Sequence, residues 1–281
     1  MARHPYTLLD VFTDRPLAGN GLAVVHDAEH VADPVMLAFA RETRLIETTF
    51  VQPSTAPGAD YRNRIWTPAE EIPFAGHPSL GTAVAVALQR GDEEAVYRQQ
   101  THAGIQPVTV RLQAGDRARA SVVQEPAEFG PELDPAAVMS AAGLQPGDAH
   151  PDLPPQIVST GLTTLVAPLA GAAAVTRARR DRAATAALHT GTFNLYLNHV
   201  EGEDATARSF PSDLDDEDPA TGSAAGPLLA YMNARVGLER LDVTQGVEIG
   251  RPSRLLAEWE DGRVRVGGDV VVLVTGTLRL P

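Results

Sequence analysis

Two segments of the sequence place polar side chains at the start of an apolar helix. They read FAGHPS at residues 74–79 and EDPATGS at residues 217–223. The first turn of a helix has backbone N–H groups without partners and carries the positive end of the helix dipole, so it attracts anions. Two such helix ends, with the imidazole of His77 and the carboxylate of Asp218, could hold a carboxylate substrate and exchange protons with it.

The two segments belong to a weak internal repeat. Aligning Gly76 with Gly222 brings three further pairs into register: Pro73 with Pro219, Glu71 with Glu217, and His77 with Ser223. Each segment opens an apolar helix, expected at residues 78–90 and 221–236, and follows several strand-like runs. A helix that is apolar almost all round must be buried. The sequence therefore predicts an α+β protein of two similar pseudo-barrel domains, each a curved, mostly antiparallel sheet around a central helix.

The remaining elements follow from periodicity and turn residues. Strands are expected at residues 6–12, 21–25, 48–51, 61–66, 96–100, 108–112, 120–124, 156–159, 163–168, 193–197 and 206–210. Asp33, followed by Pro34, has the residue types of a helix cap. A second, Ala-rich helix is expected after the strand at residues 163–168 and should run to about Leu188. The tail, residues 243–280, reads as short strands with turns that include Gly267-Gly268.

The Pro-, Gly- and acid-rich stretch at residues 127–134 is the best candidate for a linker. We therefore expect an N-terminal domain at residues 1–126 and a C-terminal domain at residues 127–281. The last strand, near residues 270–281, could return to the first domain.

Composition excludes several kinds of chemistry. The chain has 281 residues and a net charge of -13, which argues against a nucleic-acid partner. It contains no Cys, so it has no disulfide, no thiolate zinc site and no thiol base. It also contains no Lys, which removes Schiff-base chemistry and the lysine of a P-loop. Catalysis must then use carboxylates, His, Ser, Thr or Tyr.

Each candidate residue also has a structural interpretation when it is taken alone. Glu47 stands just before a strand and could be a solvated strand end. His77 and Asp218 could each cap a helix, and the hydroxyl of Ser223 could satisfy only backbone groups. The HPSLG run at residues 77–81 half-resembles a nucleophile elbow, but His replaces its first Gly and no hydrolase sheet is expected around it.

A longer set of motifs resembles the phenazine-biosynthesis PhzF-like isomerase family. The matching runs are LDVFTD at residues 9–14, Gly19-Asn20, ARE at 40–42, ETTFV at 47–51, TPAEEIPFAGHP at 67–78, EDPATGSA at 217–224 and QGVEIGRPS at 245–253. They occur in order from about residue 9 to the C-terminus, and the match is weakest between about residues 113 and 190. So many ordered motifs make the resemblance specific.

The resemblance implies a diaminopimelate-epimerase-like fold with a site in the cleft between the two domains. It also implies isomerisation of trans-2,3-dihydro-3-hydroxyanthranilate without cofactor or metal, usually by a homodimer. By motif, Glu47 would be the acid/base that moves the proton, and His77 and Asp218 would orient the substrate and share in proton handling. The expected substrate-binding residues are Asn20, Gly76, Gly222 and Ser223.

Two other functions stay open. One is an isomerase or epimerase of the same family with a different small carboxylic acid as substrate. The other is a non-catalytic ligand-binding homologue, which should have lost its acid/base, whereas Glu47, His77 and Asp218 are all present. Racemisation by two thiols, as in related epimerases of this fold, is excluded because the chain has no Cys.

The expected partner is a small anionic substrate. The eight His residues show no metal-ligand spacing, and the sequence has no nucleotide-binding Gly motif, so we expect no metal and no cofactor. No apolar run approaches the roughly 18 residues that span a bilayer, and no signal-peptide core opens the chain. We therefore expect no membrane partner and a cytoplasmic location.

Overall fold

The protein separates into two compact units in a computed structural model that describes residues 1–188, 190–212 and 216–281. The first unit comprises residues 1–123 and 267–281, and the second comprises residues 124–266. The boundaries expected from the sequence, at 126/127 and near 270, lie a few residues beyond these positions. Among the described residues, no helix is both long enough and apolar enough to cross a membrane.

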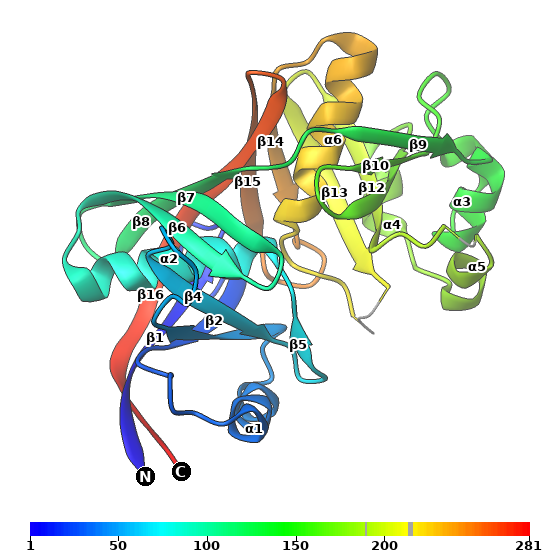
Figure 1. The fold of residues 1–281 in the computed structure, drawn as a ribbon. Helices are drawn as coiled ribbons and strands as arrows, with labels where there is room; N and C mark the ends of the chain where they lie inside the picture. Colours follow the sequence, from blue (N-terminus) through cyan, green and yellow to red (C-terminus); the bar gives the residue numbers. More distant parts are fainter. Residues whose placement is uncertain (189, 213–215) are drawn as a thin grey trace. The chain divides into compact units, whose positions relative to one another are not determined.

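The first unit is a sheet that closes around a helix. Its strands are β1 (Ala2–Val11), β2 (Asn20–Val25), β3 (Glu47–Gln52), β4 (Tyr61–Trp66), β5 (Glu71–Ile72), β6 (Glu94–Thr101), β7 (Gly104–Leu112), β8 (Arg117–Val123) and the later part of β16 (Arg263–Leu280). The order is β1-β2-β3-β4-β6-β7-β8-β16, and β16 pairs back with β1, with Ala2 opposite Leu280. Helix α1 (Asp33–Thr43) joins β2 to β3, and α2 (Gly76–Arg90) lies against strands around the sheet (Figure 1).

Close packing explains the composition of α2. All its residues from His77 to Ala87 are buried, and most of them are small or aliphatic. At Gly81 a Cβ would lie 2.7 Å from methyl carbons of Leu9 and Leu22 and 2.9 Å from one of Val11. A side chain at this position would therefore collide with β1 and β2. The helix ends at Gly91, whose φ of 76° suits glycine and whose N–H donates to the carbonyl of Ala87.

The second unit wraps a sheet around helix α6 (Gly222–Val236). Its other elements are β9 (Glu128–Glu132), α3 (Pro135–Ala141), η1 (Pro146–Asp148), β10 (Gln156–Ser159), β11 (Thr163–Pro168), α4 (Ala172–Arg177), α5 (Arg182–Ala187), β12 (Asn194–Glu201), β13 (Asp204–Pro211), β14 (Arg240–Gln245), β15 (Ser253–Glu260) and the first residues of β16. The strand order is β16-β15-β14-β13-β12-β11-β10-β9. Helix α6 contacts β10, β11, β14 and β15 (Figure 1).

Strand pairing repeats between the units. In the first unit β2 pairs with β3 and β4 with β6 in parallel, and in the second unit β11 pairs with β12 and β13 with β14 in parallel. The other pairings that define each sheet are antiparallel, as in the hairpins β3–β4 and β12–β13. In each unit the central helix precedes the second strand of the second parallel pair. The predicted fold class, two similar sheets each around one helix, is confirmed.

The segment before each central helix is held by an arginine. Arg64 on β4 donates from Nε to Glu71 at 2.8 Å, and Arg208 on β13 donates from Nη2 to Glu217 at 2.6 Å. Both arginines contact both oxygens of their carboxylate. Because the sequence repeat aligns Glu71 with Glu217, the structure gives these two residues the same anchoring role.

Four local predictions are wrong. Residues 128–132 form strand β9 and not a linker. The Ala-rich helix is two helices, α4 and α5, because Ala178 is extended and Asp181 caps a new start. Gly267-Gly268 lies inside β16, where a Cβ on Gly267 would meet the carbonyl oxygen of Ala120 at 2.6 Å. The cap of α1 is Ala32, while the Asp33 side chain binds Arg64.

Substituting Gly81 by Ala tests the packing around α2. The change gains about 1 kcal/mol of helix propensity. Overpacking of a tight core costs about 1–3 kcal/mol. The net effect of Gly81→Ala is then a free energy of unfolding lowered by up to about 2 kcal/mol, measured by urea denaturation.

Gly147→Ala is the matched control, because nothing lies within 4 Å of the added Cβ there. It should change the free energy of unfolding by less than about 0.5 kcal/mol. A Gly81→Ala protein as stable as this control would show that β1 and β2 do not pack tightly on α2.

Candidate functional site

The first half-site lies at the N-terminus of α2. Glu47, the first residue of β3, and His77, the second residue of α2, are both buried, and Nε2 of His77 lies 3.4 Å from Oε2 of Glu47. The N-cap residue, Ala75, supplies no side-chain cap, and the first turn contains no acidic residue. Thus the sequence repeat and the sheet bring together the two residues that were predicted to move protons in this unit.

His77 is held as a neutral imidazole. Burial lowers the pKa of His77 to about 3, although a hydrogen bond with the Gly21 backbone acts in the opposite direction. Nε2 has no hydrogen bond, so Nδ1 is the atom that donates to Gly21. In this tautomer Nε2 carries a lone pair and lies 3.4 Å from Oε2 of Glu47. The contact is favourable when Glu47 carries a proton and unfavourable when it does not.

The other predicted site residues of this unit, Gly76 and Asn20, each lie at the start of a helix or strand. Gly76 is the first residue of α2, partly exposed, and can present its N–H at the helix start. Asn20 is buried at the start of β2, and its neighbour Gly21 is the residue that bonds His77. Leu22, two residues after Asn20, is in register with Glu47, so β2 and β3 bring these positions to the same end of the parallel pair.

The second half-site lies at the N-terminus of α6. Asp218 is buried in the loop before the helix, and its Oδ2 accepts a hydrogen bond of 2.5 Å from the hydroxyl of Thr221. Its Oδ1 is 3.4 Å from the backbone nitrogen of Ala220. These donors stabilise the ionised form of the carboxylate. These hydrogen bonds fix the orientation of the Asp218 carboxylate.

The first turn of α6 has open donors. The backbone nitrogens of Ala224 and Ala225 bond to the carbonyl of Thr221, and no side chain caps the helix. Gly222 is buried and Ser223 is partly exposed. Within the described part of the chain, the hydroxyl of Ser223 has no hydrogen-bond partner. This end of the helix can thus offer the N–H groups of Gly222 and Ser223, together with the Ser223 hydroxyl, to a ligand.

Several supporting residues were missed by the sequence analysis. Gln245 on β14 bonds to the loop of Asp218, and the side chain of Gln124 donates to the carbonyl of Gly222 at 2.9 Å. A Cβ on Gly226 would lie only 1.7 Å from Oε1 of Gln124, so Gly226 makes room for this contact. Only the QG pair at residues 245–246 gave a signal, as part of a matching motif without an assigned role.

Glu217 has a structural role. The sequence analysis placed it beside Asp218 at the helix start, but its carboxylate is buried against Arg208. The same guanidinium donates to the carbonyl of Ala178 at 2.7 Å, close to the end of α4. Removing one partner of a buried pair costs about 3–5 kcal/mol, so Glu217 serves stability.

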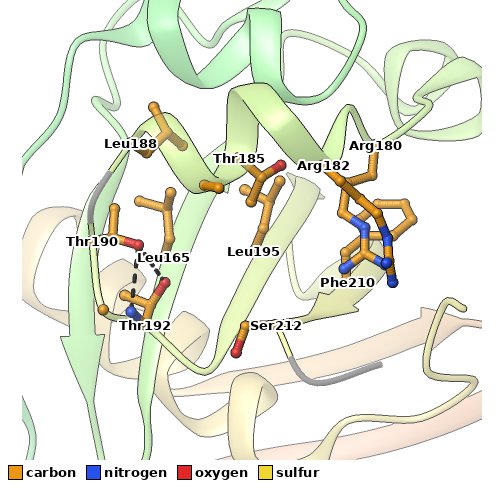
Figure 2. Close-up of a pocket in the computed structure, with 12 residues that line it drawn as sticks. Leu165, Arg180, Arg182, Thr185, Leu188, Thr190, Thr192, Leu195, Phe210 and Ser212 are labelled. Atoms are coloured by element: carbon orange, nitrogen blue, oxygen red, sulfur yellow. Dashed lines mark hydrogen bonds between the residues drawn. The ribbon is translucent and has the colours of Figure 1, made fainter. Parts of the chain in front are cut away.

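Two surface cavities are lined by other residues. One, of about 380 Å³, is in the second unit, and Figure 2 shows Arg180 and Arg182 beside Phe210 at one side and Thr190 bonded to Thr192 at the other. The other, of about 410 Å³, is in the first unit, between Gln52 and Arg90. Neither is lined by a residue predicted to be catalytic or to bind substrate.

No three His, Asp or Glu side chains within residues 1–188, 190–212 and 216–281 are grouped as a metal site would require. His189, one of the eight His residues considered from the sequence, lies outside the described residues.

Comparison with known proteins identifies the family. The sequence model of the phenazine biosynthesis-like proteins, PhzC-PhzF, matches residues 9–276. The chain belongs to this family. A curated relative, the trans-2,3-dihydro-3-hydroxyanthranilate isomerase of Pseudomonas aeruginosa, is 34% identical over 267 residues, which cover 94% of this chain and 93% of the relative. The predicted family is confirmed.

Solved structures of other proteins agree with the fold. A predicted epimerase from Pseudomonas aeruginosa is 38% identical, has a TM-score of 0.87, and is matched over 98% of this chain and 99% of its own. A hydroxyproline epimerase from Agrobacterium vitis is 12% identical, with a TM-score of 0.64 over 99% and 91% of the two chains. The names of these relatives also confirm the predicted class of enzyme, an isomerase.

The buried imidazole predicts how stability of this family member depends on pH. The pKa of His77 is lowered to about 3, whereas that of an unfolded His is about 6.5. Between these values only the unfolded state binds the proton. The free energy of unfolding should therefore fall as the pH falls from about 6.5 towards 3, by up to about 1.4 kcal/mol per pH unit for this group.

His77→Gln should flatten that slope, measured by chemical denaturation between about pH 4 and 7. Some slope should persist in both proteins, because burial also lowers the pKa of His26, to about 4. The exposed His30 serves as the control, since His30→Gln should leave the slope unchanged. Identical slopes in wild type and His77→Gln would contradict a buried neutral His77.

Proposed function

We propose that this family member is a cofactor-free isomerase that shifts a proton along a small cyclic amino-bearing carboxylic acid. The first candidate substrate is trans-2,3-dihydro-3-hydroxyanthranilate. The observation that carries the proposal is the buried contact of Glu47 with a neutral His77 at the open end of α2. A proton shift between two carbons needs one group that can take up the proton and return it nearby.

Glu47 suits this double role better than the other site residues. The lone pair of His77 Nε2, 3.4 Å from Oε2, can accept a hydrogen bond from a protonated Glu47. Asp218, in contrast, accepts two hydrogen bonds that stabilise its anion. His77 is itself too weak a base, because its pKa is lowered to about 3. We therefore propose Glu47 as proton shuttle, His77 as its orienting partner and Asp218 as a substrate anchor.

The substrate carboxylate would be held by backbone N–H groups at the helix starts. Gly76 begins α2 and Gly222 begins α6, and neither helix has a side-chain cap. Both helix starts carry partial positive charge, so each can attract an anionic group, and Ser223 adds a donor at the start of α6. Asn20 would contribute to binding on the side of the first unit. Positioning of this kind provides the larger part of the rate enhancement, beyond the roughly 10²–10⁴-fold of acid/base catalysis.

The runner-up is an isomerase or epimerase of another small carboxylic acid. It would use the same groups, and only the shape of the ligand would differ. Absorbance and mass spectrometry on dihydro-hydroxyanthranilate, with a panel of cyclic amino acids alongside, separate the two. The homodimer and the cytoplasmic location stay predictions, and analytical ultracentrifugation tests the first.

Ligand binding tests the role of the helix starts. 3-Hydroxyanthranilate and related benzoate-type acids should raise the melting temperature, because a carboxylate can accept hydrogen bonds from the free N–H groups. The corresponding amides, which have the same shape without the charge, should not. Equal stabilisation by acid and amide would argue against a carboxylate site.

Substitution of Glu47 tests the chemistry. Glu47→Gln keeps the shape and removes the titrating group, so turnover and incorporation of solvent deuterium should both be abolished. Affinity for 3-hydroxyanthranilate should stay within about tenfold, or roughly 1.4 kcal/mol. Asp218→Asn and His77→Ala should weaken binding as well as rate. A Glu47→Gln protein that keeps a substantial part of wild-type turnover would assign the proton transfer to another residue.

A further inference from the structure

The loop before α6 is fastened by one buried amide. Gln245, the last residue of β14, is 1% exposed. Its Nε2 donates to the carbonyl of Asp218 at 2.7 Å and to the hydroxyl oxygen of Thr221 at 3.0 Å. Its Oε1 accepts from the backbone nitrogen of Thr221 at 3.3 Å and from the hydroxyl of Tyr196 at 3.1 Å. The amide thus uses both N–H groups and two acceptor positions.

These partners fix the direction of every hydrogen bond. A backbone nitrogen can only donate, so the side-chain atom facing the nitrogen of Thr221 must be the amide oxygen of Gln245. A carbonyl can only accept, so the atom facing the Asp218 carbonyl must be the amide nitrogen. Because Thr221 accepts from that nitrogen, its own hydroxyl proton is free to point at Oδ2 of Asp218, 2.5 Å away. The result is a chain of donors that ends on a carboxylate.

Tyr196 begins this chain as a donor. Burial, with a further contribution from the charge of Asp218, raises the pKa of Tyr196, so its hydroxyl keeps its proton at neutral pH. Glu217, the residue before Asp218, is paired with Arg208 on β13. A further contact, the antiparallel bridge from Asp218 to Ser209, adds no charge.

Gly246, the residue after Gln245, allows the Gln245 amide to reach the loop of Asp218. Gly246 has a φ of 76°, and a Cβ there would lie 2.6 Å from the carbonyl oxygen of Pro219 and 2.5 Å from that of Arg251. Only glycine allows this turn to press against the residue that follows Asp218. Both residues of the QG pair, Gln245 and Gly246, therefore contact the loop of Asp218.

We propose that Gln245 is a positioning residue that directs the Thr221 hydroxyl onto Asp218 and so keeps this carboxylate ionised and in one orientation. Tyr196 holds the amide in the required orientation. The inference rests on the proposed function for its catalytic consequence, since Asp218 matters there as the substrate anchor. The effect on Asp218 itself does not depend on any substrate.

Three variants separate the contributions of the individual hydrogen bonds between Gln245, Thr221 and Asp218. Thr221→Val removes the donor to Asp218, and Thr221→Ser keeps it and should behave as wild type. Gln245→Glu replaces the amide N–H groups with an acceptor, so the Thr221 hydroxyl turns away from Asp218. We expect Thr221→Val and Gln245→Glu to produce the same defect, and the double variant to add little to either.

The direct readout is the titration of Asp218 in the free protein, followed by NMR of 13C-labelled aspartate carboxyl groups. The signal is assigned by its loss in Asp218→Asn. The midpoint should rise by about one pH unit, or about tenfold in proton affinity, in Thr221→Val and Gln245→Glu. An unchanged midpoint in both variants, with normal unfolding transitions, would overturn the proposal.

Kinetics and binding complete the test. With Asp218 as an anchor, KM and the Kd of 3-hydroxyanthranilate should rise about tenfold at neutral pH, and the acid limb of the binding profile should move upward with the NMR midpoint. A lower melting temperature with an unmoved acid limb would show that Gln245 is only structural. If the NMR midpoint moves while wild type turns over no tested substrate, the positioning role stands and the proposed function fails.

Discussion

Each unit depends on burying an apolar helix inside one curved sheet. Helix α2 is buried from His77 to Ala87, and α6 from Ala224 to Met232. Such burial requires small residues where strands come close, as at Gly81 in the first unit and Gly226 in the second. It also places the starts of both helices beside strand ends, where a single residue such as Glu47 can approach the first turn. The chemical groups are thus gathered by the packing that stabilises the fold.

The arginine–glutamate pairs connect packing to the site. A short segment before each helix must leave the sheet and turn sharply into the first helical residue. The buried guanidinium of Arg208 holds this segment through Glu217, and Arg64 does the same through Glu71. With the segment anchored, Asp218, next to Glu217, has little freedom. The two carboxylates of the EDP motif are therefore used differently: Glu217 pairs with Arg208, and Asp218 accepts from Thr221.

The sequence predicts the elements better than the contacts. Strand β4 has the predicted bounds, because alternation and turn residues act locally. Strand β9 was missed, because its Gly130-Pro131 content is typical of a loop and its pairing with β10 is long-range. Gly267 was predicted to lie in a turn, whereas a glycine is needed there because β8 approaches the backbone too closely for a side chain. The role of Gln245 could not be predicted, because its partners, on β12 and in the loop before α6, are distant in the sequence.

The repeat explains why the two half-sites can differ so much in chemistry. Both units supply the same frame, an anchored segment followed by an open helix start, yet the side chains at the two ends are not equivalent. One end combines Glu47 with a neutral imidazole, and the other holds an anionic Asp218 beside a hydroxyl. Inversion of a stereocentre by two bases requires one proton acceptor on each side with matched affinity. The pair at the start of α2 instead suits a reaction in which a single group removes a proton and returns it.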